Sequence, residues 1–165
     1  MQLFEMTQIF DFITVSFSKL AAKDFKNVGF VIMPNHMHFV VFAGEQSENL
    51  NREIGNTKRF LAYEIVHRLK AARETRTLRT LQDGVAEKER SIGKQHQVFR
   101  GSFDAQPITD ERELYKVLDY MHHNPVKGKW NLVDDFRDYP FSSAGFYELE
   151  RPCSFPLWDH RQFLW

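Results

Sequence analysis

A short stretch near the start of the chain, residues 29–42, constrains the fold most strongly. Two apolar, strand-like runs are joined there by Pro34-Asn35. Proline and asparagine are turn residues, since proline fixes its backbone and asparagine tolerates unusual backbone angles. The stretch therefore predicts a β-hairpin with strands over residues 28–33 and 36–42.

Two histidines open the second predicted strand. A β-strand alternates its faces, so His36 and His38 project to the same side while Met37 and Phe39 point the other way. Two imidazoles about 6–7 Å apart along a strand can bind one metal ion. The alternative is an edge strand with two exposed histidines, and the pair by itself does not decide between them.

Length and composition limit the class of protein. With 165 residues, 42% of them hydrophobic, the chain is long enough to bury one core, and a disordered chain is excluded. No apolar run approaches the roughly 20 residues that span a bilayer, and the first residues lack the features of a signal peptide. The single cysteine, Cys153, cannot form an internal disulfide. We expect a cytoplasmic protein without a membrane partner.

Charge is balanced overall but unevenly distributed. Residues 52–79 carry eight Lys or Arg against three Glu, whereas residues 130–165 carry three Arg against six acidic residues. A basic stripe can bind a polyanion such as a nucleic acid. The alternative is a solvated helix face with ion pairs, which is the commoner meaning of such runs.

Other segments predict alternating helices and strands. Apolar spacing favours a helix over residues 6–22, with a strand as the alternative. It also favours a long helix over residues 47–72, capped by Ser47. Residues 73–95 are charged and show little periodicity, which predicts a mobile excursion that orders on a partner. Residues 97–103 are typical of a further strand.

A second informative element is the helix predicted over residues 110–124. Asp110 and Glu113 are spaced as an N-cap pair, and the proline after Asn124 ends the helix. Tyr120 and Asn124 lie one turn apart on the same face. They can serve one site, as nucleophile and as ligand to a hard cation, or they are only a rim tyrosine and a helix stop.

Five motifs follow one another along the chain: Val31–His38, Phe103–Ile108, Tyr120–Val126, Lys129–Leu132 and Tyr139–Ser143. In this order and spacing they resemble the single-tyrosine HUH transposases, which include the REP-associated tyrosine transposases. The resemblance covers roughly residues 3–148. It implies a single domain over residues 1–165, with residues 149–165 as a C-terminal tail.

The resemblance also implies an α+β fold with a ferredoxin-like or RRM-like antiparallel sheet and helices on one face. His36 and His38 would lie on a central strand opposite the tyrosine helix. Family members usually begin with a strand before the helix that we place at residues 6–22, and only about five residues precede it here. We therefore expect the first strand to be missing or shortened, unless a neighbouring segment fills the gap.

Residue by residue, the resemblance makes His36 and His38 metal ligands, Tyr120 the nucleophile and Asn124 the third protein ligand. His123 is the rival for that third position. The metal implied is Mg²⁺ or Mn²⁺, which would polarise a phosphate oxygen. A tyrosine phenol, with an ordinary pKa near 10, needs such help to attack at neutral pH.

The implied substrate is single-stranded DNA carrying a hairpin, contacted by Lys58, Arg59 and Lys127. The implied reaction is cleavage and strand transfer through a 5′-phosphotyrosine. Whether the site forms within one chain or across a homodimer is left open. The alternatives are a non-catalytic protein that binds single-stranded nucleic acid, descended from such an enzyme, and an α+β protein whose histidines are structural.

Overall fold

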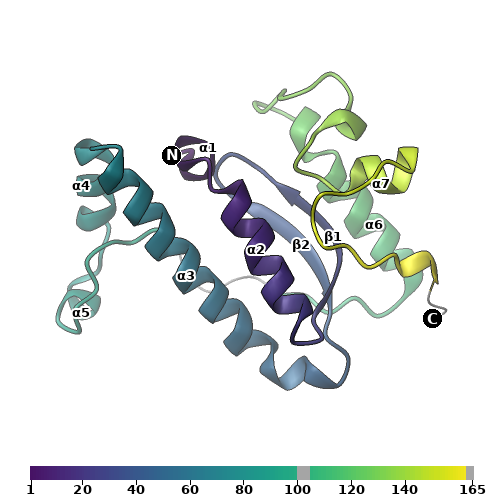
Figure 1. Cartoon of the computed structure of the whole chain (residues 1–165), viewed down its shortest axis with the longest axis horizontal. Helices are drawn as coiled ribbons and strands as arrows, with labels where there is room; N and C mark the ends of the chain where they lie inside the picture. Colours follow the sequence, from purple (N-terminus) through teal and green to yellow (C-terminus); the bar gives the residue numbers. More distant parts are fainter. Residues whose placement is uncertain (100–104, 163–165) are drawn as a thin grey trace.

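The computed structural model describes residues 1–99 and 105–162, which combine several helices with one small antiparallel sheet. The sheet is a hairpin of β1 (Lys26–Ile32) and β2 (Met37–Phe42). It lies in the middle of the molecule with helices around it (Figure 1). The α+β fold class and the predicted hairpin are confirmed, with the strand ends shifted by one or two residues.

Two helices precede the hairpin, α1 (Leu3–Thr7) and α2 (Phe10–Ala21). The helix predicted over residues 6–22 is confirmed as α2, and the strand alternative is wrong because the buried apolar side chains of this segment have helical spacing. Helix α1 occupies the place where the resemblance implies a first strand. The buried apolar residues of α2 are Ile13, Phe17 and Leu20.

The long helix after the hairpin is confirmed. A short 3-10 helix, η1 (Gly44–Asn49), leads into α3 (Leu50–Ala71). Ser47 lies inside η1 and does not cap α3, whose N-cap residue is Asn49 without a side-chain hydrogen bond. None of the helices in the described parts of the chain is long and apolar enough to cross a membrane.

Residues 73–95 do not form the irregular excursion that their composition predicted. They contain α4 (Thr75–Asp83) and α5 (Glu87–Arg90), and α4 packs on α3. Leu81 and Val85 are buried. The Arg90 side chain donates to the backbone oxygen of Val85 at 3.0 Å, which helps to close the turn between the two helices.

The tyrosine helix is α6 (Glu111–His122), followed by η2 (Asn124–Val126). Its predicted cap is confirmed, since the Asp110 carboxylate accepts from the backbone N–H of Glu113 at 2.7 Å. Residues 97–99 contain no regular strand, and the rest of the strand predicted over 97–103 lies outside the described residues. The C-terminal part adds η3 (Phe136–Asp138), α7 (Ala144–Leu149) and η4 (His160–Gln162).

Helices cover both faces of the hairpin, whereas the resemblance implied one face. Phe30 and Ile32 join α1, α2 and α3 in one apolar cluster, and Val31 and Met33 join α6 in another. Both faces are covered because β1 is buried at nearly every position, so that side chains on both of its faces need apolar partners.

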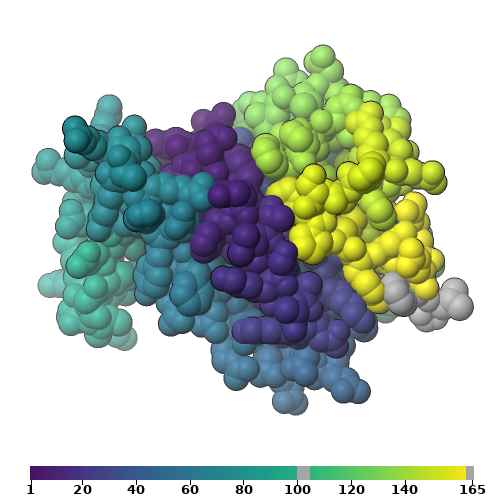
Figure 2. Space-filling model, viewed as in Figure 1, coloured from purple at the N-terminus to yellow at the C-terminus, as the bar shows by residue number. Residues whose placement is uncertain are grey.

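The outer edge of β1, where a further strand would pair, is covered by residues 139–158. Val31 and Ser142 form an isolated antiparallel bridge there. Figure 2 shows the C-terminal residues, in yellow, lying against the purple α2, and the rings of Phe17 and Phe155 are 6.2 Å apart. Seven hydrogen bonds between 2.6 and 3.0 Å join these residues to β1. With the donor first, they are Ile32 N to Phe141 O, Ser143 N to Phe30 O, Phe30 N to Ser143 Oγ, Trp158 N to Asn27 O, Asn27 Nδ2 to Pro156 O, Tyr139 Oη to Ile32 O and Tyr147 Oη to Val28 O.

Candidate active site

The two histidines of the hairpin lie side by side. His36 is the last residue of the turn and His38 is in β2, and both are half-buried. Their ring centroids are 5.0 Å apart and the ring planes are nearly perpendicular, at 88°. The predicted pairing of these side chains is therefore present, although His36 comes just before the strand.

Tyr120 approaches His38 from α6, with 6.3 Å between the ring centroids. Gly29 in β1 gives α6 room, because a Cβ atom there would force the side-chain ends of Leu118 and Met121 on α6 to shift. The glycine lets α6 lie close to the hairpin. Tyr120 itself is 59% exposed and thus accessible to a large substrate.

Burial and hydrogen bonding determine the protonation of the two histidines. Burial lowers the pKa of His38, and burial with the positive charges of His38 and Lys129 lowers the pKa of His36. Both rings are therefore neutral at pH 7, which is the form that binds metals. The Nδ1–H of His36 donates to Oδ1 of Asn35 at 2.6 Å, which leaves Nε2 of His36 as the available ligand atom.

Asn124 follows directly after α6 and begins η2. Its side-chain Nδ2 is buried, and no hydrogen-bond partner is present for it within residues 1–99 and 105–162. The same described residues contain no cluster of three His, Cys, Asp or Glu that could hold a metal. A third protein ligand beside the two histidines would therefore be of another type, and an amide oxygen such as that of Asn124 is one that hard cations accept.

The histidines on α6 have other partners. The ring of His123 packs against Phe136 at 4.0 Å, and its Nδ1 donates to the backbone oxygen of Asp119 at 2.8 Å. His122 is buried, and its Nε2 is hydrogen-bonded to Ser143 Oγ at 2.8 Å. The bond at Nδ1 leaves Nε2 of His123 as its ligand atom, as in His36, so His123 stays the rival of Asn124 for a third ligand position.

Among the residues predicted to contact DNA, Lys127 lies next to Tyr120, with Nζ 5.1 Å from the centre of the Tyr120 ring. Lys58 and Arg59 are on α3, in the helical layer on the other face of the hairpin. Lys58 lies over the ring of Phe99 at 5.7 Å, and Arg59 lies over the ring of Phe60 at 5.3 Å.

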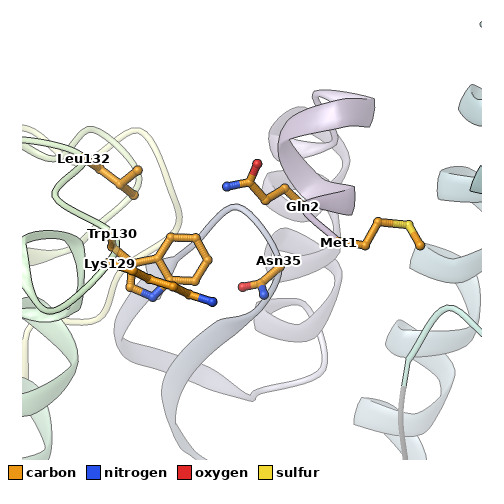
Figure 3. Close-up of a pocket in the computed structure, with 6 residues that line it drawn as sticks. All are labelled: Met1, Gln2, Asn35, Lys129, Trp130 and Leu132. Carbon is orange, nitrogen blue, oxygen red and sulfur yellow. The ribbon is translucent and has the colours of Figure 1, made fainter.

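An aromatic residue that our sequence reasoning did not select also borders the site. The Trp130 ring centroid is 5.9 Å from that of His36. Beside it is a pocket of about 380 Å³, whose lining side chains are drawn in Figure 3. Asn35 was likewise missed. The signal that could have found it is its place next to His36, since metal-bound histidines usually donate their second ring N–H to a neighbour.

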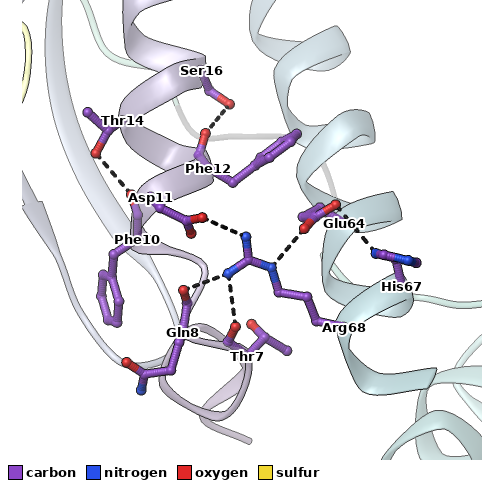
Figure 4. Close-up of polar contacts among 10 residues, drawn as sticks. All are labelled: Thr7, Gln8, Phe10, Asp11, Phe12, Thr14, Ser16, Glu64, His67 and Arg68. Atoms are coloured by element: carbon purple, nitrogen blue, oxygen red, sulfur yellow. Dashed lines mark hydrogen bonds and ion pairs between the residues drawn. The ribbon is translucent and has the colours of Figure 1, made fainter. Parts of the chain in front are cut away.

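Part of the basic stripe is structural. The Arg68 guanidinium donates to the backbone oxygens of Thr7 and Gln8 and to the carboxylates of Asp11 and Glu64 (Figure 4). The bonds to Asp11 and Glu64 raise the pKa of Arg68. Together with the bonds to Thr7 and Gln8, they tie α3 to the junction of α1 and α2. For this arginine the alternative of an ion-paired helix face is confirmed.

The comparisons with known proteins give one distant similarity. The chain is 25% identical over 119 residues to a Haemophilus influenzae protein named "Putative REP-associated tyrosine transposase". The similarity covers 72% of this chain and 58% of the relative, so the chain matches little more than half of that protein's length. No protein-family model matches the chain, and no solved structure matches it.

Proposed function

We propose that this protein cleaves and rejoins single-stranded DNA through a covalent link to Tyr120. The observation that carries the proposal is the convergence of Tyr120 with His36 and His38 on one side of the hairpin. The similarity to a protein named as a tyrosine transposase supports the same reading.

In the proposed step, the Tyr120 oxygen attacks a backbone phosphorus of the strand. The new oxygen–phosphorus bond forms as the bond to the 3′ oxygen breaks, and the phenolic proton passes to solvent while the leaving oxygen becomes a 3′-hydroxyl. A 3′-hydroxyl can reverse the step, so joining needs no other energy source.

His36, His38 and the amide oxygen of Asn124 would hold Mg²⁺ or Mn²⁺. When bound, the ion would polarise a non-bridging phosphate oxygen and stabilise charge in the transition state. Neutral imidazoles suit this role, and the Asn35 hydrogen bond orients His36 for it. The ammonium of Lys127, beside Tyr120, would attract the phosphate or stabilise the developing phenolate.

The proposal is tested with a library of hairpin-bearing single strands labelled at the 3′ end, incubated with the protein and Mn²⁺. We expect a labelled protein band on a denaturing gel. Tyr120→Phe should give no such band, because phenylalanine has no nucleophilic oxygen. Tyr115→Phe is the matched control on the same helix and should behave like the wild type.

An adduct formed equally well by Tyr120→Phe would refute the assignment of the nucleophile. Strand binding by the wild type with no adduct under any metal condition would support the non-catalytic binding protein instead.

A further inference from the structure

The pocket beside His36 has the composition of a small aromatic binding site. Its lining combines an aromatic ring, two amides and a lysine, contributed by the N-terminus, the hairpin turn and the segment after η2. The lining residues are Met1, Gln2, Asn35, Lys129, Trp130 and Leu132.

Figure 3 shows the side chains of Trp130, Asn35 and Gln2 arranged around one hollow, with Met1 directed away from it. A volume of about 380 Å³ falls in the range of pockets that hold small molecules. An aromatic ring next to hydrogen-bonding amides suits a planar ligand with polar edges, as a nucleobase is.

Asn35 connects this pocket to the histidines. Its Oδ1 accepts from His36, which leaves the two N–H groups of Nδ2 for another acceptor. Within the described parts of the chain, Nδ2 has no hydrogen-bond partner. A ligand bound by this amide would therefore lie directly beside a proposed metal ligand.

Lys129 completes the site. Its Nζ lies 5.1 Å from the centre of the Trp130 ring, and its positive charge contributes to the lowered pKa of His36. The Lys129 side chain is exposed, so its ammonium can pair with a phosphate while the ring binds the attached base.

We propose that this pocket binds one unpaired base of the strand held at the His36–His38 site, stacked on Trp130 with its edge toward Asn35. The inference rests on the proposed function. It adds that a base near the reacting phosphate is held by the protein and that Trp130 positions the strand for attack by Tyr120.

The test compares two strands of equal length and charge at low salt with Mn²⁺, an oligothymidylate dodecamer and an abasic dodecamer. Stacking of one base on an aromatic ring is worth about 1–3 kcal/mol, roughly five- to 150-fold in affinity. We expect Trp130→Ala to weaken oligothymidylate binding by about tenfold or more and to leave abasic binding unchanged. Trp130→Phe should retain most of the affinity.

Tyr63→Ala is the matched control, because Tyr63 is an exposed aromatic residue on α3. It should bind both strands as the wild type does. A second readout uses a chain in which Trp158 and Trp165 are replaced by Phe. Its remaining Trp130 fluorescence should be quenched by the oligothymidylate and not by the abasic strand.

Equal losses for both strands in Trp130→Ala would overturn the base pocket, because a general structural effect does not depend on the bases. Unchanged affinity for oligothymidylate would overturn it as well. In both cases the wild type still binds the strand, so the proposed function survives. Failure of the wild type to bind either strand would overturn the two proposals together.

Discussion

Two histidine pairs in this chain have different surroundings. His36 and His38 are half-buried, adjacent to each other and within reach of Tyr120 and Trp130. His122 and His123 are consecutive on a helix, so they point in different directions, one into the core and one against Phe136. Residues at positions i and i+2 of an extended segment, such as His36 and His38, project to the same side. Consecutive residues at the end of a helix, such as His122 and His123, project in different directions. We therefore expect the first pair to serve function and His122 to serve stability.

The largest effect that separates the pairs should come from His36→Ala combined with His38→Ala. Removing both proposed ligands should lower the rate of strand cleavage by at least about a thousandfold, since a metal ion contributes several kcal/mol of transition-state stabilisation. Mn²⁺ binding, measured by calorimetry, should be lost while the thermal unfolding midpoint changes little. His67→Ala is the control, because His67 is an exposed histidine on α3. Normal Mn²⁺ binding by the double variant would place the metal elsewhere.

A smaller effect, on stability alone, should come from acidification acting through His122. Burial lowers the pKa of His122 to about 4, from an ordinary value of 6.5. The His122 imidazole binds a proton more readily in the unfolded chain than in the folded protein. The free energy of unfolding is therefore highest above about pH 6.5 and decreases as the pH falls toward 4. The loss should reach about 3 kcal/mol.

Denaturant unfolding between pH 4 and pH 7.5 measures this loss. His122→Gln should remove that part of the pH dependence, while leaving Mn²⁺ binding at pH 7.5 within a few-fold of wild type. If the variant kept the full pH dependence, other groups would have to account for it.

The smallest effect should come from Lys127, which tests whether the DNA-binding site extends to the residues that follow His122 and His123. Lys127 follows α6 and lies over Tyr120, so Lys127→Ala should weaken single-strand binding about threefold. Its salt dependence should also decrease, with the slope of log affinity against log salt reduced by about 0.7. Lys19→Ala, an exposed lysine on α2, is the control. An unchanged slope would mean that Lys127 does not contact the DNA strand.

Local signals predicted the elements that position the site. The Pro34-Asn35 turn marked the hairpin, and the Asp110 cap marked the start of α6. The meeting of Tyr120 with the histidines was expected only from the family resemblance, because spacing within the chain says nothing about which distant elements pack together. Gly29, which allows that packing, gives no local sign of its partner.

The sequence did not predict the helices within residues 73–95 or the place of Trp130 in a pocket, and both failures have physical causes. Residues 73–95 bury few apolar side chains, chiefly Leu81 and Val85, so their helical pattern is masked by charges. Trp130 is one of several aromatic residues, and sequence cannot tell a pocket wall from a core residue when its partners come from the N-terminus and a turn.

The covering of the β1 edge by residues 139–158 has a consequence for how the chain folds. The hairpin forms from residues synthesised early, yet its open edge is closed by residues synthesised late. Contacts of such sequence separation form slowly, and an unpaired strand edge is prone to join other chains while it waits. During synthesis, the β1 edge therefore stays open to pairing with other chains until residues 139–158 have left the ribosome.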